Sequence, residues 1–179
     1  MAATSASRIQ FEYMMGGGPP VLVTYPEAYN SSGWDQGTPL AKDSSGHMIR
    51  IAPGGNLTSG SNVHAVAISP MTSTADGSVT KPFILVTPQT VFSIVMSHGT
   101  TASAVVQSAQ VGCIYAISSS TTVTCAATNT WVADIATTDQ IGAYIIANKD
   151  ATGTAYGRNY FIFAHGAYSS DSPFWRCST

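Results

Sequence analysis

Alternating apolar and polar residues predict short β-strands along most of the chain. Ile9, Phe11 and Tyr13 alternate with polar neighbours, and a comparable alternation returns over residues 63–68. A period of two places successive side chains on opposite faces of a strand. Clusters of Gly, Pro, Asn, Asp and Ser interrupt these stretches at short intervals, which is typical of turns. The chain is therefore expected to fold into antiparallel strands joined by tight connections.

The same pattern gives a domain plan. About ten short strands are expected, which indicates an all-β fold, either a β-sandwich or a β-barrel. The chain is divided by its glycine- and proline-rich stretches. We expect an N-terminal arm with a first strand and a Gly-Pro hinge over 1–20, a small β unit over 21–82, a larger C-terminal β-barrel over 83–168 and a tail over 169–179. Strands over 140–148 and 158–165 are expected to pair through the intervening loop.

Composition narrows the class of protein. Charged residues make up only 9% of the chain, the net charge is −2, and 44% of the residues are hydrophobic. The long polar residues that cover helix surfaces are scarce, so helical bundles and coiled coils are excluded. The apolar content excludes disorder. So few lysines and arginines argue against coating a nucleic acid, because phosphate binding requires clustered basic residues.

Targeting signals are not expected. Residues 1–7 are small and polar, without the basic and apolar regions of a signal peptide. No apolar run approaches the roughly 20 residues that a membrane helix needs. Synthesis in the cytoplasm, without membrane association, is therefore expected.

The cysteines allow two interpretations. Cys113 and Cys125 lie symmetrically about Ser119, within a run of serines and threonines. If that run is a hairpin loop, the two cysteines face each other at a distance close to that of a disulfide. The alternative is a pair of reduced, buried thiols that act as small hydrophobic residues. Cys177 leaves an odd count.

No arrangement of residues predicts catalysis, a cofactor or a metal. The nine carboxylates are scattered, and only Asp134 and Asp139 lie close together. The four histidines lack the spacing of a zinc motif, and no serine stands in a nucleophile elbow. The glycines at 16–18 precede prolines rather than a helix, so they do not form a phosphate-binding loop. The chain is expected not to be an enzyme.

A weakly charged surface instead favours contacts with other proteins. Aromatic and methionine residues near a glycine hinge and in the C-terminal tail are candidate anchors, since such residues dominate many interfaces. The alternative is that both ends of the chain simply close the barrel. The candidate partner contacts are Arg8, Phe11, Tyr13, Met14, Trp34, Phe174 and Trp175.

Two groups of segments resemble a known family. The first, a Gly-x-Pro-Leu motif followed by an alternating strand, covers 37–46 and 63–68. The second is a series of strands and turns over 110–117, 131–134, 139–144 and 157–163. Together these segments resemble the decoration (cement) proteins of tailed-bacteriophage capsids.

That resemblance implies a structural, non-catalytic virion protein, made in the host cytoplasm and located on the outer capsid surface. Its partner would be the major capsid protein, whose capsomers it would bridge against the pressure of the packaged DNA. The resemblance favours a homo-oligomer, a trimer before a dimer.

Two other functions remain open. In a tail, fibre or lectin-like receptor-binding module, Tyr29, Trp34 and Trp131 would serve as platforms for sugars. In a β-sandwich hydrolase, Asp134 and Asp139 would supply the acids.

Overall fold

The computed structural model describes residues 8–29, 33–51, 63–97, 105–120, 130–138 and 142–164. Within these ranges the chain is almost entirely β, as predicted, with one short 3-10 helix, η1, at Ser108–Gln110. The strands are β1 (Gln10–Met14), β2 (Leu22–Pro26), β3 (Pro39–Lys42), β4 (Met48–Arg50), β5 (Ala65–Ala67), β6 (Thr80–Leu85), β7 (Thr90–Ser97), β8 (Ile114–Ser120), β9 (Thr130–Thr138), β10 (Ala143–Asn148) and β11 (Arg158–Phe163).

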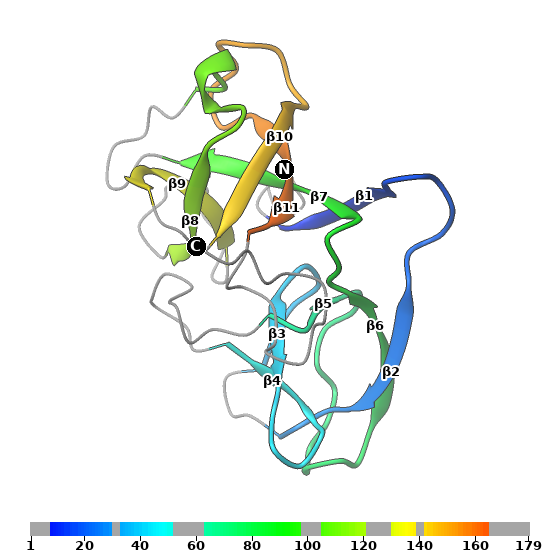
Figure 1. The fold of residues 1–179 in the computed structure, drawn as a ribbon. Helices are drawn as coiled ribbons and strands as arrows, with labels where there is room; N and C mark the ends of the chain where they lie inside the picture. The colour runs from blue at the N-terminus through cyan, green and yellow to red at the C-terminus, as the bar shows by residue number, and fades with distance from the viewer. Residues whose placement is uncertain are drawn as a thin grey trace, which may run out of the picture.

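The larger sheet closes into a barrel. Its strand order is β1-β7-β11-β10-β8-β9, and a parallel pairing of β7 with β9 joins the two sides. β7 to β11 therefore form a closed five-stranded ring, with β1 added at the outside of β7 (Figure 1). The predicted C-terminal barrel is confirmed, as is the pairing of the last two strands through their connecting loop.

The smaller sheet has the order β2-β6-β5-β3-β4 and lies below the barrel in Figure 1. β2 and β4 are its outer strands, and they meet at one end. Glu27 forms a parallel bridge with Met48, and the Ala28 N–H donates to the Met48 carbonyl at 3.0 Å. The sheet is thus curled, with its two edges touching just beyond β2.

The connections between the sheets change the predicted division of the chain. β1 is not a free arm but a strand of the larger sheet, and β6 extends the smaller sheet to Leu85 rather than to residue 82. β1 and β7 are neighbours, and the Met15 N–H donates to the Gln89 carbonyl at 2.8 Å. All five strands of the smaller sheet are therefore inserted between two adjacent strands of the larger one.

Two apolar cores hold the molecule together. The first fills the barrel and continues onto one face of the smaller sheet, so that Val66 and Ile84 pack with Phe92 and Phe161. The second lies on the opposite face of the smaller sheet and contains Trp34, Leu40, Met48, Ala65, Ala67 and Phe83. Because the first core includes residues of both sheets, burial of apolar surface stabilises their attachment to each other.

Buried amides attach the loop before β8 to the barrel. The Gln110 Oε1 atom accepts hydrogen bonds from the Asn159 side chain at 2.9 Å and from the Gln107 N–H at 3.1 Å. The Gln110 Nε2 atom donates to the Val105 carbonyl at 2.9 Å. Both amide side chains are buried, so these bonds replace water that the groups have lost.

The hairpin expected around Ser119 is wrong. β8 continues to Ser120, and Ser119 lies opposite Trp131 within the ladder. Cys113 carries a free thiol whose Sγ atom donates to the Ala109 carbonyl at 3.4 Å, while Cys125 lies outside the described residues. Burial and a hydrogen bond with Cys113 raise the pKa of Tyr115 to about 12.

Candidate functional site

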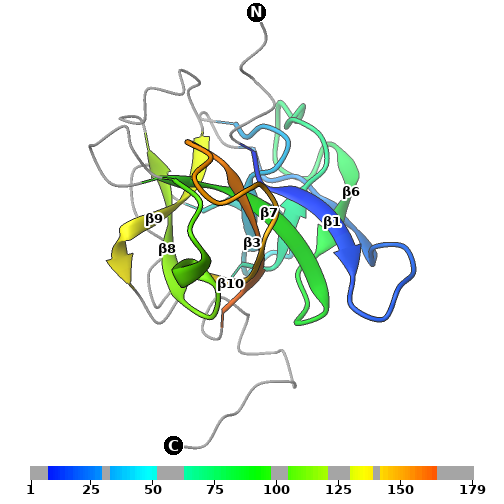
Figure 2. The same cartoon turned by 90° about the horizontal axis from the view of Figure 1, so that it is seen from above.

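Four exposed apolar side chains gather around the connection from β1 to β2. Tyr13, Met15, Val21 and Leu22 expose 44%, 39%, 44% and 55% of their surfaces. Both strands are outer strands of their sheets within the described part of the chain. Figures 1 and 2 show the loop between them projecting from the side of the molecule. We call these four residues, with Gly16 to Gly18, the β1–β2 corner.

Three glycines give the corner its shape. Gly16, Gly17 and Gly18 have φ angles of +92°, +84° and +95°, a region that residues with a Cβ atom rarely adopt. A Cβ atom added to any of them would meet nothing within 4 Å. The glycines are therefore required by backbone conformation rather than by crowding.

A β-bulge determines which side chains of β1 face outward. The register with β7 shifts between Phe11 and Tyr13, so Glu12 is an extra residue. A shift of one residue moves the following side chains to the opposite face. Tyr13 consequently points to solvent, with its ring edge-on to Tyr160 at 5.8 Å, whereas Met14 is buried.

A network of polar side chains connects β1 to the strands of the barrel. The Ser93 hydroxyl donates to Glu12 at 2.5 Å, and Lys149 forms an ion pair with the same carboxylate. The buried Arg158 guanidinium donates to the Ser93 hydroxyl at 2.9 Å and to the Arg8 carbonyl at 2.6 Å. These bonds tie the strand that carries Tyr13 to the barrel.

Burial lowers the pKa of Arg158, and the nearby carboxylates of Glu12 and Asp150 oppose this effect. An arginine remains protonated at neutral pH despite such a shift. Its positive charge and that of Lys149 are balanced by the two carboxylates. The network therefore holds strands together without leaving an unpaired buried charge.

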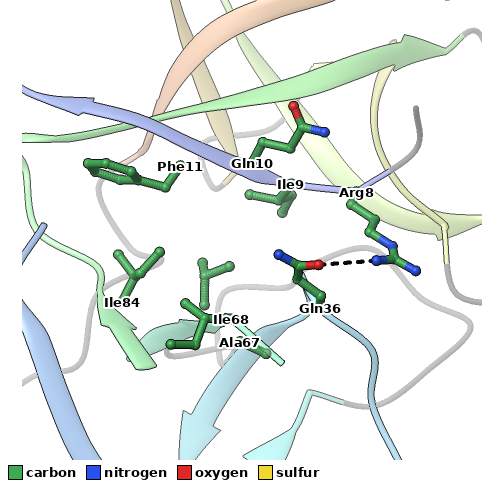
Figure 3. Close-up of a pocket in the computed structure, with 9 residues that line it drawn as sticks. Arg8, Ile9, Gln10, Phe11, Gln36, Ala67, Ile68 and Ile84 are labelled. Atoms are coloured by element: carbon green, nitrogen blue, oxygen red, sulfur yellow. Dashed lines mark hydrogen bonds between the residues drawn. The ribbon is translucent and has the colours of Figure 1, made fainter. Parts of the chain in front are cut away.

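A cleft of about 360 Å³ lies between β1 and the smaller sheet (Figure 3). Arg8 and Gln36 close one end through a hydrogen bond of 3.2 Å, while Phe11 and Ile84 lie at the other. Most of the lining residues are apolar, but polar atoms supply the larger part of the cleft surface, and Arg8 is the single ionisable side chain among the lining residues. The lining comprises Arg8, Ile9, Gln10, Phe11, Gln36, Val66, Ala67, Ile68 and Ile84.

The predicted contact residues have different positions. Tyr13 is exposed, and Arg8 and Phe11 are half-buried in the cleft wall. Met14 and Trp34 are buried, so their prediction as partner contacts is wrong. Met14 is turned inward by the bulge, and Trp34 packs against Phe83 with ring centroids 6.3 Å apart. Phe174 and Trp175 lie outside the described residues.

Two of the three candidate sugar platforms are buried, whereas the acid pair is only partly described. Trp34 and Trp131 are both buried, and only Tyr29 of the three platforms is exposed. Asp134 is half-buried on β9, and Asp139 is not among the described residues. Within the described ranges, no group of three or more His, Cys, Asp or Glu side chains is placed to hold a metal ion.

Although sequence reasoning counted the methionines beside the glycine hinge among the candidate anchors, it missed Val21 and Leu22. A signal for them was present, because apolar residues stand on both sides of three glycines and two prolines. A flexible run of this kind cannot bury its neighbours by itself. Their exposure at a loop between two edge strands is therefore a consequence of the local sequence.

Comparison of the chain with family models, with curated proteins and with solved structures finds no match. The part of the chain that the structure describes contains no helix with the length and apolar character needed to span a bilayer. Arguments about function therefore depend on the residues themselves.

Proposed function

We propose that this chain is a structural virion protein that binds the outer surface of a tailed-phage head and stabilises the mature capsid by bridging capsomers. The proposal combines the resemblance of its strand-and-turn segments to decoration proteins with one structural observation. That observation is the β1–β2 corner, an exposed apolar surface on a firmly held strand.

Tyr13 and Met15 are the residues that would contact the capsid. Aromatic and methionine side chains are enriched in interface centres, and an aromatic ring such as that of Tyr13 buries a large area at a low cost in conformational entropy. The bulge and the polar network fix the direction in which Tyr13 points. Little ordering would be needed on binding, which favours affinity.

A lattice of capsomers also suits a weakly charged protein. Because the net charge of the chain is only −2, several copies of it can lie close together with little mutual repulsion. A homo-oligomer would contact the major capsid protein at several points. Modest single contacts then add up through a high effective concentration.

A sedimentation experiment tests the proposal. Heads of the virus that encodes this chain, stripped of it and then separated into expanded and unexpanded forms, are mixed with purified protein and pelleted. We expect the wild-type chain to pellet with expanded heads only. The double variant Tyr13→Ser and Met15→Ser should bind at least about tenfold more weakly.

Tyr144→Ser provides the control, since Tyr144 is another exposed aromatic residue, on β10. Its binding should equal that of the wild type. If mature heads lack this chain, or if the double variant binds as well as the control, the proposal is wrong.

A further inference from the structure

Among the strands that the structure describes, none pairs with the outer edge of β2. The Leu85 N–H donates to the Val21 carbonyl at 2.9 Å, and the Glu27 N–H donates to the Val79 carbonyl at 2.8 Å. In an antiparallel ladder, alternate residues bond to the same neighbour. The odd-numbered residues of β2 therefore bond to β6, and Leu22 and Thr24 direct their N–H and C=O groups toward the outer edge.

This open edge is short because both of its ends are closed. The next even-numbered residues on either side of Leu22 and Thr24 are Pro20 and Pro26, which have no N–H to donate. Beyond them, the Ala28 N–H is already bonded to Met48. Leu22 and Thr24, both exposed, are thus the two residues of β2 whose backbone can accept a new strand.

The chemistry of the edge indicates what would cover it. Two donors and two acceptors in an extended row match another β-strand. Natural proteins protect such an edge with prolines, short strands or charged side chains; here the prolines limit the open edge to two residues, and the β2 sequence Leu-Val-Thr-Tyr-Pro carries no charge. A second β2 strand would meet no charge repulsion, and the set of donors and acceptors is complementary to itself.

We propose that β2 pairs antiparallel with β2 of a second copy of this chain, around a two-fold axis that passes beside Val23. Leu22 of one copy then lies opposite Thr24 of the other, and each copy donates two backbone hydrogen bonds, four in all. The Leu22 side chains of both copies come to the same face, within reach of each other. The two smaller sheets become one continuous sheet.

The pairing specifies a dimer instead of the trimer that the family resemblance favours, because a two-fold contact uses the same surface on both copies. It does not depend on binding to a head. Of the β1–β2 corner the pairing uses Leu22, whereas Tyr13 and Met15, the two residues proposed to contact the capsid, lie on β1 and in the loop after it, outside β2. The two proposals therefore fail separately.

Sedimentation equilibrium of the whole chain, from about 1 µM to about 1 mM, tests the inference. The wild type should shift from monomer to dimer with concentration. Thr24→Pro removes one outward N–H without breaking a bond to β6, and Leu22→Lys places a charge on the edge. Each should weaken association at least about tenfold.

Two matched variants keep the test specific. Thr24→Ala retains the backbone N–H, and Tyr144→Lys adds a charge to an exposed apolar residue on the other sheet. Both should dimerise within about twofold of the wild type. Circular dichroism should show the same β content in all four variants.

Hydrogen exchange gives a second measurement that does not depend on the variants. The amides of Leu22 and Thr24 should become protected as concentration rises, whereas those of Val23 and Tyr25 should be protected throughout. A monomer at every concentration, a trimer, or a dimer whose Leu22 and Thr24 amides stay unprotected would overturn the inference. A monomer that still binds heads would leave the proposed function intact.

Discussion

Glu27 provides the most demanding test of how the smaller sheet is held together. Its carboxylate is fully buried and accepts hydrogen bonds from the backbone N–H groups of Thr72 at 3.1 Å and Ser73 at 2.8 Å. Lys81 Nζ lies 3.1 Å from the other oxygen as an ion pair and donates to the Pro70 carbonyl at 2.6 Å. One side chain thus fixes the loop between β5 and β6.

The substitution Glu27→Gln preserves the shape and removes the charge. The amide oxygen can still accept from Thr72 and Ser73, but the amide nitrogen then faces the Lys81 ammonium, donor against donor. Loss of one partner from a buried ion pair costs about 3–5 kcal/mol. Because Lys81 retains some access to solvent, we expect the lower end, about 3 kcal/mol of unfolding free energy.

Urea unfolding measures this loss. With a slope of about 2 kcal/mol/M, the midpoint should fall by about 1.5 M. Asp43→Asn is the matched control, since an asparagine can continue to accept from the Ser45 and His47 N–H groups in the turn. The control should shift the midpoint by less than about 0.5 M.

The pair can also be tested by a double-mutant cycle. Lys81→Met leaves the carboxylate buried without its cation and should be destabilising by itself. The double variant should lose less than the sum of the two single losses, because both single changes break the same ion pair. Equal midpoints for Glu27→Gln and Asp43→Asn, or strict additivity in the cycle, would refute the role given to Glu27.

Three further predictions concern the barrel. Gly142→Ala should destabilise the protein by several kcal/mol in thermal unfolding, since the new Cβ atom would clash with the Tyr115 carbonyl oxygen. Gly112→Ala is the control. Gly112 has a φ of +86° and open space around it, so this change should cost only about 1 kcal/mol. Gln110→Met should cost about 2–3 kcal/mol because Asn159 loses its acceptor, and Asn159→Leu in the same chain should recover part of that loss; a strictly additive loss would contradict the pairing. Spectrophotometric titration should show the Tyr115 phenol ionising near pH 12. Stability should therefore fall as pH rises from 10 to 12, because the native state keeps a proton that the unfolded chain releases. In Tyr115→Phe that contribution should be absent.

The sequence predicted the class of fold because the relevant signals are local. The alternation at Ile9 and Phe11 reflects the burial of side chains on a pleated sheet. So do the two apolar segments that form β10 and β11. Turn residues marked most of the boundaries between strands. The predicted domain boundary at residue 82 falls within β6 rather than at its end. Pro82 is tolerated in this strand because it lies beyond the end of the neighbouring strand β5.

The surface was harder to predict because it depends on partners distant in sequence. The bulge at Glu12 arises in the pairing with β7 and cannot be seen in the alternation of β1, so Met14 was predicted to be exposed although it is buried. Trp34 lies in a polar stretch, and its burial depends on Phe83 and the rest of the second core, which are distant in sequence. The serines before Ser120 predicted a turn. Serine also fits a strand, and here the pairing of β8 with β9 continues to Ser120.

The chain leaves the larger sheet after β1 and returns to it at β7, with the Met15 N–H and the Gln89 carbonyl 2.8 Å apart. A tension applied between β1 and β11 would cross from β1 to β7 through the ladder that joins them, without stretching the five strands inserted between. The smaller sheet would remain unloaded until that ladder ruptured. Its strands would then act as a reserve of length that unfolds only after β1 has separated from β7, while the barrel itself stays closed.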